Sequence, residues 1–280
     1  MTRKKYGEAE LCVLAADITP SPKNFIREAY SRSVLNKILV ENVLLYEPAN
    51  FYRRLAAFAQ YEPEAWRKIP QETRALMDEW YVREYIDRAR PRLESALKDG
   101  ELIENAFFFT LDETLELCDS MPFLPYVVPC NCKSVAMACE KPCEVCILFN
   151  RGINSEWDRG HGRELSKEEA KAVARRADKN GLMHTSEEMV AICHCCGDCC
   201  YPIRASKMLG TKGLWPKQRY RIMWHEEKCV SCGSCAAACN FGAFKRNGKQ
   251  MMFEERECWG CTICAGSCPV QAISIEKIQK

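Results

Sequence analysis

The chain has 280 residues. A single hydrophobic core usually organises a shorter chain than this, so the length predicts two or three domains. Its formal net charge of +2 is nearly balanced, which excludes a general electrostatic argument for binding nucleic acid or a membrane surface. The 20 cysteines are too many for ordinary core positions, so they indicate disulfide, metal or redox chemistry.

The N-terminal segment favours a cytoplasmic protein. Residues 1–10 contain no uninterrupted apolar stretch, small-residue cleavage site or twin arginine, so we expect no export signal. No apolar run approaches the length of about 18 residues that a spanning helix needs, and we expect no membrane insertion. In a reducing cytoplasm, dense cysteine indicates metal ligands more often than disulfides.

Residues 1–120 are predicted to form a helical domain. Proline-containing turns precede an expected helix near residues 24–44, a second near 51–61 and a third that begins after Pro70. Along the third helix, apolar residues recur at spacings of three and four and predict one packed face. This stripe consists of Val82, Ile86, Ala89, Leu93 and Leu97.

The end of this region is expected to contain a strand and a last helix. Pro91 should kink the third helix and Gly100 should end it. The apolar run 106–110 predicts a short buried strand, and another helix should open at Asp112.

The N-terminal region contains no sequence motif of a self-contained NAD- or ATP-using enzyme. We expect it to dock the cysteine-bearing part onto a larger enzyme, with Trp66, Trp80 and Tyr81 as either interface anchors or core residues. The alternative is the DNA-binding domain of a redox-sensing regulator. Acidic residues match its arginines, however, so we expect no nucleic acid partner.

The central region, residues 121–218, is predicted to be a loop-rich cysteine domain. A capping box at Ser166 and a stop at Asn180 predict a helix between two cysteine groups. One helix can reverse the chain and bring the two cysteine groups together. The sequence alone leaves open whether the groups meet. The candidate metal ligands are Cys130, Cys132, Cys139, Cys143 and Cys146 in the first group and Cys193, Cys195, Cys196, Cys199 and Cys200 in the second.

These central thiols are compatible with several metal centres. They suffice for two further [4Fe-4S] clusters, for one cluster with the other thiols structural, for a non-cubane or site-differentiated cluster, or for zinc or reactive thiols. Side chains of adjacent cysteines, such as Cys195 and Cys196, point apart and favour two centres over one. We interpret His194 as a solvated or hydrogen-bonded histidine and Asp198 as a turn residue, rather than as ligands.

The last part of the chain, residues 219–280, contains the same cysteine motif twice. Each copy reads C-x2-C-x2-C-x3-C, and three thiolates at this spacing wrap a loop around one cubane while the fourth ligates the other cubane. Zinc ribbons use pairs of cysteines separated by a longer spacer and do not fit this pattern. The expected ligands are Cys229, Cys232, Cys235 and Cys268 for one [4Fe-4S] cluster and Cys258, Cys261, Cys264 and Cys239 for the other.

The residues around the two motifs predict a β-α-β-β-α-β tail. Alternating apolar residues in 220–224 and 272–275 indicate two paired strands, and Asn247-Gly248 indicates a hairpin between the copies. The tail resembles the two-[4Fe-4S] bacterial ferredoxin family. One departure from that family is Asn240, which stands where the second copy has Pro269. The central region is similar to a cysteine-rich domain fused upstream of ferredoxin modules in anaerobic iron–sulfur proteins.

The sequence therefore predicts an α+β protein that transfers electrons through iron–sulfur clusters: two in the tail and one or two in the centre. We expect a subunit or dedicated electron donor of a low-potential oxidoreductase in an anaerobe, whose partner is a redox protein or a larger oxidoreductase complex. Such a carrier needs no catalytic acid or base. The first alternative is an iron–sulfur enzyme with an active-site cluster in the central groups, and the second is the redox-sensing regulator.

Overall fold

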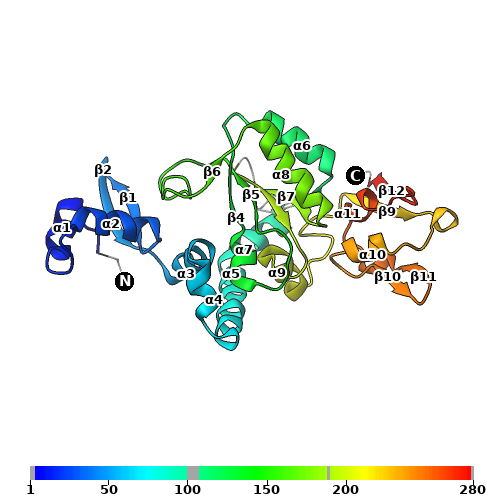
Figure 1. Cartoon of the computed structure of the whole chain (residues 1–280), viewed down its shortest axis with the longest axis horizontal. Helices are drawn as coiled ribbons and strands as arrows, with labels where there is room; N and C mark the ends of the chain where they lie inside the picture. Colours follow the sequence, from blue (N-terminus) through cyan, green and yellow to red (C-terminus); the bar gives the residue numbers. More distant parts are fainter. Residues whose placement is uncertain (1–3, 100–106, 188–189, 279–280) are drawn as a thin grey trace.

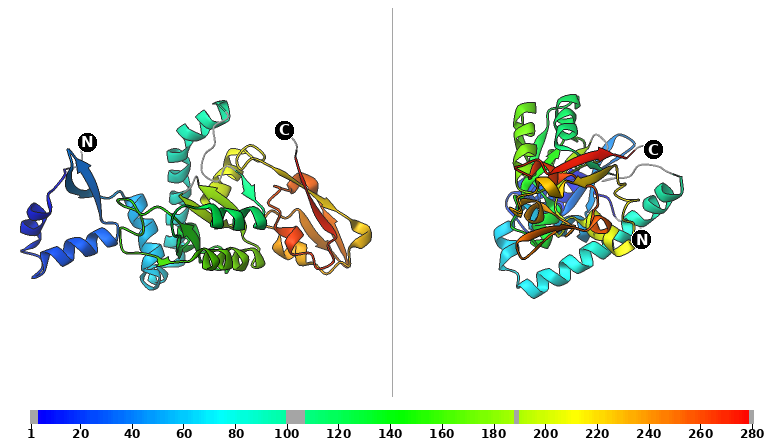
Figure 2. Two further views of the ribbon diagram at one scale, coloured as in Figure 1. Left: turned by 90° about the horizontal axis from the view of Figure 1, so that it is seen from above. Right: turned by 90° about the vertical axis from the view of Figure 1, so that its right-hand side faces the viewer.

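The computed structural model describes residues 4–99, 107–187 and 190–278. Three parts follow one another along the longest axis: an N-terminal hairpin unit, a central sheet with its helices, and the tail (Figure 1). The left view of Figure 2 shows the same three parts from above. The α+β class is confirmed. Within the described ranges, no helix is long and apolar enough to cross a membrane.

Two short helices and a hairpin form the N-terminal unit. They are α1 (Glu8–Ala15), α2 (Pro22–Ser31), β1 (Leu35–Val40) and β2 (Val43–Pro48). The helix predicted near residues 24–44 is therefore wrong beyond Ser31. Ser33, with a φ of 55°, departs from helical geometry, and Glu41 and Asn42, with φ of 50° and 64°, form a two-residue left-handed turn that pairs the strands.

Three helices follow, and the two longer ones were predicted. They are α3 (Phe51–Tyr61), α4 (Pro63–Lys68) and α5 (Gln71–Asp99), which continues through Pro91. The expected stop at Gly100 and the first residue of the expected strand, Ala106, lie outside the described residues. Trp66 and Tyr81 are buried in the core that α3 and α5 share, whereas Trp80 is 37% exposed.

The central region contains a six-stranded antiparallel sheet that the sequence analysis did not predict. Its strand order is β3-β7-β8-β5-β4-β6. The strands are β3 (Phe108–Phe109), β4 (Tyr126–Pro129), β5 (Glu144–Leu148), β6 (Arg163–Glu164), β7 (Met183–Glu187) and β8 (Ala191–Cys195). The associated helices are α6 (Leu111–Ser120), α7 (Asn131–Ala136), α8 (Lys167–Lys179) and α9 (Tyr201–Leu209).

Side-chain alternation gives this sheet two different faces. Helix α8, which begins at the predicted capping box of Ser166, packs on β5, β7 and β8. Val145, Ile147 and Ile192 belong to the same hydrophobic core as the apolar face of α8. Because successive residues of a strand point to opposite faces, the cysteines of β5 and β8 lie on the face away from α8.

The tail has the predicted β-α-β-β-α-β order. Its elements are β9 (Tyr220–Trp224), α10 (Ser234–Ala238), β10 (Phe244–Asn247), β11 (Gln250–Phe253), α11 (Ile263–Gly266) and β12 (Ile273–Lys277), with short 3₁₀ turns η1 (Glu226–Lys228) and η2 (Glu255–Glu257). Strands β9 and β12 pair antiparallel, and β10 and β11 form the predicted hairpin. Gly248, with a φ of 60°, lies in its tight turn.

Candidate metal centres

The tail brings its eight motif cysteines together as two groups of four. One cavity is lined by Cys229, Cys232, Cys235 and Cys268. A second cavity is lined by Cys239, Cys258, Cys261 and Cys264. Each group takes three thiols from one motif copy and the fourth from the other copy.

The two cysteine loops share one backbone conformation. Ser231 and Gly260 hold equivalent positions in the two copies, with φ of 53° and 67°, and the next equivalent pair, Gly233 and Thr262, has φ of 86° and 68°. These left-handed residues turn the backbone around the cavity. In each loop an amide donates to a sulfur: Ser231 N to Cys229 Sγ and Gly260 N to Cys258 Sγ, both at 3.4 Å. Such amide contacts stabilise bound thiolates.

Burial keeps the thiols of Cys235 and Cys261, one from each tail cavity, protonated when no metal is bound. It raises the pKa of Cys235 to about 11 and that of Cys261 to about 12. Cys232 is exposed, and its hydrogen bond with Ser234 lowers its pKa. Metal ligation removes these protons, so the tail thiols fit a group that binds thiolates strongly.

The central region brings its two cysteine groups together around one cavity of about 140 Å³. The lining thiols come from both groups and are those of Cys130, Cys132, Cys146, Cys193, Cys195, Cys196 and Cys200. Cys130 precedes α7, Cys200 precedes α9, and the others come mainly from β5 and β8. Within this lining, Cys132 lies near Cys130 and Cys200, and Cys146 lies near Cys193.

A buried lysine lies beside these thiols. Lys133 is 5% exposed and donates from Nζ to the carbonyl oxygen of His194 at 2.7 Å. Burial lowers the pKa of Lys133, but the neighbouring cysteines, with Cys130 and Cys195 foremost, together raise it by more, so the net shift is upward. Its charge would therefore offset that of thiolates in this cavity. The sequence analysis missed this role. The one feature of the sequence that could have indicated it is a lysine directly after Cys132.

Two further thiols, those of Cys139 and Cys199, meet the thiol of Cys196. Cys139 Sγ lies 3.6 Å from Cys196 Sγ and 3.5 Å from Cys199 Sγ. Hydrogen bonds from Cys139 and Cys199, together with the amide of Cys199 at 3.3 Å, lower the pKa of Cys196. Cys143 is placed apart from them, with its sulfur 3.4 Å from Ser134 Oγ.

His194 is hydrogen-bonded, as the sequence analysis interpreted it. Its Nδ1 lies 2.8 Å from Nδ1 of His184, its cross-strand neighbour, and His184 Nε2 lies 3.2 Å from Asp178 Oδ1. Among the described residues, His194 Nε2 has no hydrogen-bond partner. Burial, His184 and Lys133 hold the pKa of His194 well below its ordinary value. Asp198 is an exposed turn residue.

The tail packs directly against the central cysteines. Cys261 and Ile263 of the tail share one hydrophobic cluster with Cys195 and Cys200 of the centre. In the same cluster, Trp259 stacks on Phe241 with ring centroids 4.6 Å apart. The second tail cavity is therefore the one nearer to the central thiols.

Asn240 ties the two parts together. Its Oδ1 accepts from Lys141 Nζ at 3.0 Å and from the amide of Gly197 at 3.2 Å. Its Nδ2 donates to the carbonyl oxygen of Gly181 at 2.9 Å. The departure from the ferredoxin pattern at this position is thus a set of contacts between the tail and three separate segments of the central region.

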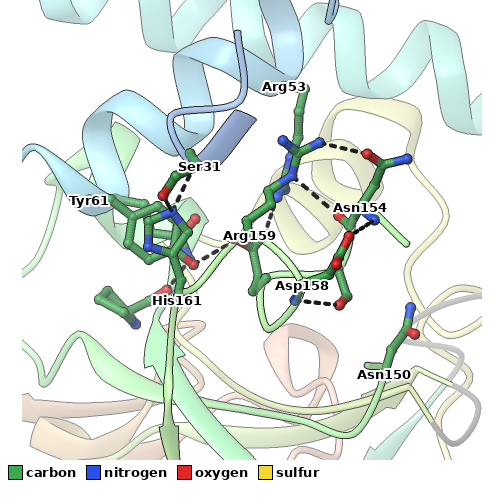
Figure 3. A network of polar contacts seen from close by, with 12 residues as sticks. Ser31, Arg53, Tyr61, Asn150, Asn154, Asp158, Arg159 and His161 are labelled. Atoms are coloured by element: carbon green, nitrogen blue, oxygen red, sulfur yellow. Dashed lines mark hydrogen bonds and ion pairs between the residues drawn. The ribbon is translucent and has the colours of Figure 1, made fainter. Parts of the chain in front are cut away.

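A polar network joins the N-terminal unit to the loop between β5 and β6 (Figure 3). Arg159, 3% exposed, donates to the carbonyl oxygens of Tyr30 and Leu35 at 2.6 and 2.9 Å. His161 stacks on Tyr61 with ring centroids 3.6 Å apart. The stacking explains His161 as a packing residue, and the hydrogen bonds of Arg159 hold the N-terminal unit on the central region.

Comparison with known proteins identifies the tail. Residues 223–275 match the family model described as a 4Fe-4S dicluster domain. No curated protein matches the chain. The tail is therefore an iron–sulfur module of ferredoxin type, and the chain has an iron–sulfur electron-transfer role.

Proposed function

We propose that the chain carries electrons between three iron–sulfur clusters, two in the tail and one in the central cavity. In the tail, Cys229, Cys232, Cys235 and Cys268 hold the outer cluster, and Cys239, Cys258, Cys261 and Cys264 hold the inner one. Two observations support this assignment: each set lines one cavity, and amides donate to sulfurs in both. When bound, the clusters supply one-electron redox chemistry.

The central cluster is the part of the proposal that goes beyond the dicluster domain. A cubane needs four thiolates, and six cysteines lie around the central cavity without belonging to the Cys139 group. These six are Cys130, Cys132, Cys146, Cys193, Cys195 and Cys200. Lys133 offsets the charge that ligation creates, since it stays positively charged beside Cys130 and Cys195.

The single observation that carries the proposal is the shared hydrophobic cluster of Cys195, Cys200 and Cys261. It puts a ligand of the inner tail cluster against two thiols of the central cavity. Electrons therefore have a short path between the two cavities that does not cross solvent. The outer tail cluster extends this path to the surface.

The surface end of the path is the site where a partner protein would exchange electrons. All 20 cysteines lie in the described residues, and Cys232 is the exposed one. Val230, in the same loop, is 62% exposed. We propose that a redox partner approaches this loop, and that the chain is a subunit or dedicated donor of a low-potential oxidoreductase in an anaerobe.

A second candidate function is catalysis at the central cluster. Six thiols exceed the need of a cubane, and Tyr52 and Tyr85 line the same cavity. A cluster with an exchangeable iron beside these rings would be open to a small substrate. An EPR signal of the central cluster that shifts with cyanide or carbon monoxide would favour this enzyme over a simple carrier.

The proposal is tested by iron and acid-labile sulfide analysis on protein purified without oxygen. Three cubanes give about twelve irons per chain, whereas the tail alone gives about eight. Cys235→Ala should remove the outer tail signal from the EPR spectrum of the reduced protein, and Cys195→Ala should alter the central one. Cys12→Ala, which lies in neither group, is the matched control. An iron content of about eight in the wild type would contradict the central cluster.

A further inference from the structure

One group of thiols is left over by the three proposed clusters. The sulfurs of Cys139, Cys196 and Cys199 all lie within 4.8 Å of one another. In the part of the chain that the structure describes, no other three Cys, His, Asp or Glu side chains meet in this way. The closest approaches, 3.5 and 3.6 Å, both involve Cys139.

These separations distinguish a single ion from a cluster. A tetrahedral zinc ion with Zn–S bonds of about 2.3 Å holds its sulfurs about 3.8 Å apart. In a cubane each thiolate binds a different iron, so the sulfurs stand on the order of 6 Å apart. The Cys139, Cys196 and Cys199 sulfurs therefore have the spacing of one tetrahedral ion.

The surroundings are those of a closed structural site. Cys196 and Cys199 are 0% exposed and lie in the core between the sheet and α8. The amide of Cys199 donates to Cys196 Sγ at 3.3 Å, a contact that stabilises a bound thiolate. Four thiolates in a tetrahedron suit zinc, which has no redox chemistry of its own.

We propose that Cys139, Cys143, Cys196 and Cys199 bind one zinc ion. Cys143 is assigned as the fourth ligand because it follows Cys139 with three residues between them and lines the same surface depression as Cys139. Its sulfur lies apart from the other three, beside Ser134, so its side chain would have to turn toward the ion. The two pairs have three and two intervening residues, which is the spacing of zinc ligands. The ion ties the loop at 139–143 to the loop at 196–199, beside the contacts of Asn240. This site goes beyond the proposed electron transfer and does not depend on the central cluster.

The test is metal analysis and zinc X-ray absorption on the full chain purified without oxygen. We expect about one zinc per chain, with four sulfurs at about 2.3 Å and no short metal–metal distance. Neighbouring residues provide a matched pair of variants. Cys199→Ser should lose the zinc, whereas Cys200→Ser should keep it and alter the central cluster.

The outcomes separate this proposal from the proposed function. About sixteen irons and no zinc would overturn the zinc site and leave a central cluster in place. About eight irons with one zinc would support the zinc site and overturn the central cluster. Zinc retained in Cys199→Ser, or lost in Cys200→Ser alone, would also overturn the ligand set. If Cys199→Ser fails to fold, the wild-type absorption spectrum still decides between four sulfurs and another environment.

Discussion

The backbone of Asn240 lies so close to Gly197 that a Cβ added to Gly197 would collide with the carbonyl oxygen of Asn240. Gly197 belongs to the second central cysteine group, and Asn240 follows a thiol of the inner tail cavity. Their contact lies beside the apolar cluster that contains Cys195, Cys200 and Cys261. The packing between these two residues therefore sets how closely the tail approaches the centre.

We expect Gly197→Ala to loosen this contact. The added methyl group meets backbone atoms rather than a flexible side chain, so overpacking should cost about 1–3 kcal/mol. Freeze-quench EPR should show the tail clusters reduced at the wild-type rate and the proposed central cluster reduced several-fold more slowly. Gly7→Ala is the control, because nothing lies within 4 Å of a Cβ at that position. Unchanged central reduction in Gly197→Ala would show that this contact does not position the tail.

Asn240→Pro should separate tail folding from tail docking. Proline restores the residue found after the last cysteine of the second copy, and Cys239, with ψ of 114°, has the backbone that precedes proline. The substitution removes hydrogen bonds to Gly181, Gly197 and Lys141, which contribute about 1 kcal/mol each. Both tail clusters should assemble, while reduction of the central cluster slows.

Asn240→Asp provides the graded comparison for this prediction. It keeps the oxygen that accepts from Lys141 and Gly197 and loses the amide donor, which bonds Gly181 and, within the tail, Ala238. Its effect on central reduction should therefore fall between the wild type and Asn240→Pro. Loss of the tail EPR signals in Asn240→Pro would instead assign Asn240 to folding of the tail itself.

A second contact between the parts depends on a charge at Glu113. Burial raises the pKa of Glu113, but hydrogen bonds from Tyr220 and Thr110 and the charge of Arg219 outweigh it, and the net shift is downward. At a pH close to or somewhat below about 4.3, the ordinary pKa of a glutamate, Glu113 in the folded protein therefore binds fewer protons than in the unfolded chain. The stabilisation is present above that pH and is lost as the pH falls through the folded pKa.

Glu113→Gln should accordingly destabilise the protein at neutral pH by about 1 kcal/mol, the contribution of a partly buried charged contact. The difference in unfolding free energy between wild type and variant should shrink on acidification. Comparing the two proteins at each pH cancels cluster loss common to both. Glu116→Gln, on the same helix but with no hydrogen bond or ion pair to the tail recorded among the described residues, is the control. A difference that is constant from pH 7 to pH 4 would contradict the assigned role of the Glu113 charge.

The sequence was sufficient to predict the tail because motif spacing and strand alternation agree there. The grouping of thiols around the tail cavities is the one that the spacing implies, and ligation itself stays a prediction. The hairpin at residues 35–48 was missed because its turn uses Glu41 and Asn42 instead of glycine. The central sheet was missed because β5 and β8 lack the usual alternation of apolar and polar residues. Cysteines occupy the positions on the face opposite α8, where polar residues would have marked a strand.

Contacts between distant segments were beyond reach of the sequence. Asn240 reads as a harmless replacement of proline until Gly181 and Gly197 are seen against it. His184 gives no signal alone, since its partners His194 and Asp178 come from another strand and a helix. Spacing can group thiols within one loop, but which loops meet depends on packing across the whole sheet.

Removing the metals should unfold the tail before the N-terminal helices. The tail has short strands and one small apolar cluster, in which Cys235 and Cys264 are buried among Ile222, Phe244 and Ile273. Without metal, much of the order of such a module is lost, since ligation contributes directly to folding. Helix α5 is packed instead in a core of large side chains such as Trp66, Tyr81 and Trp215. We therefore expect anaerobic chelation to leave α5 folded.

Hydrogen exchange read by mass spectrometry provides the measurement. After chelation, amides of β9 and β12 should lose protection by several orders of magnitude, while those of α5 change little. The β1–β2 hairpin, which contains no cysteine, serves as the internal control. Full protection of β9 and β12 in protein shown to contain no iron would mean that apolar packing alone folds the tail. Loss of protection throughout the chain would mean that the N-terminal helices depend on the metal centres as well.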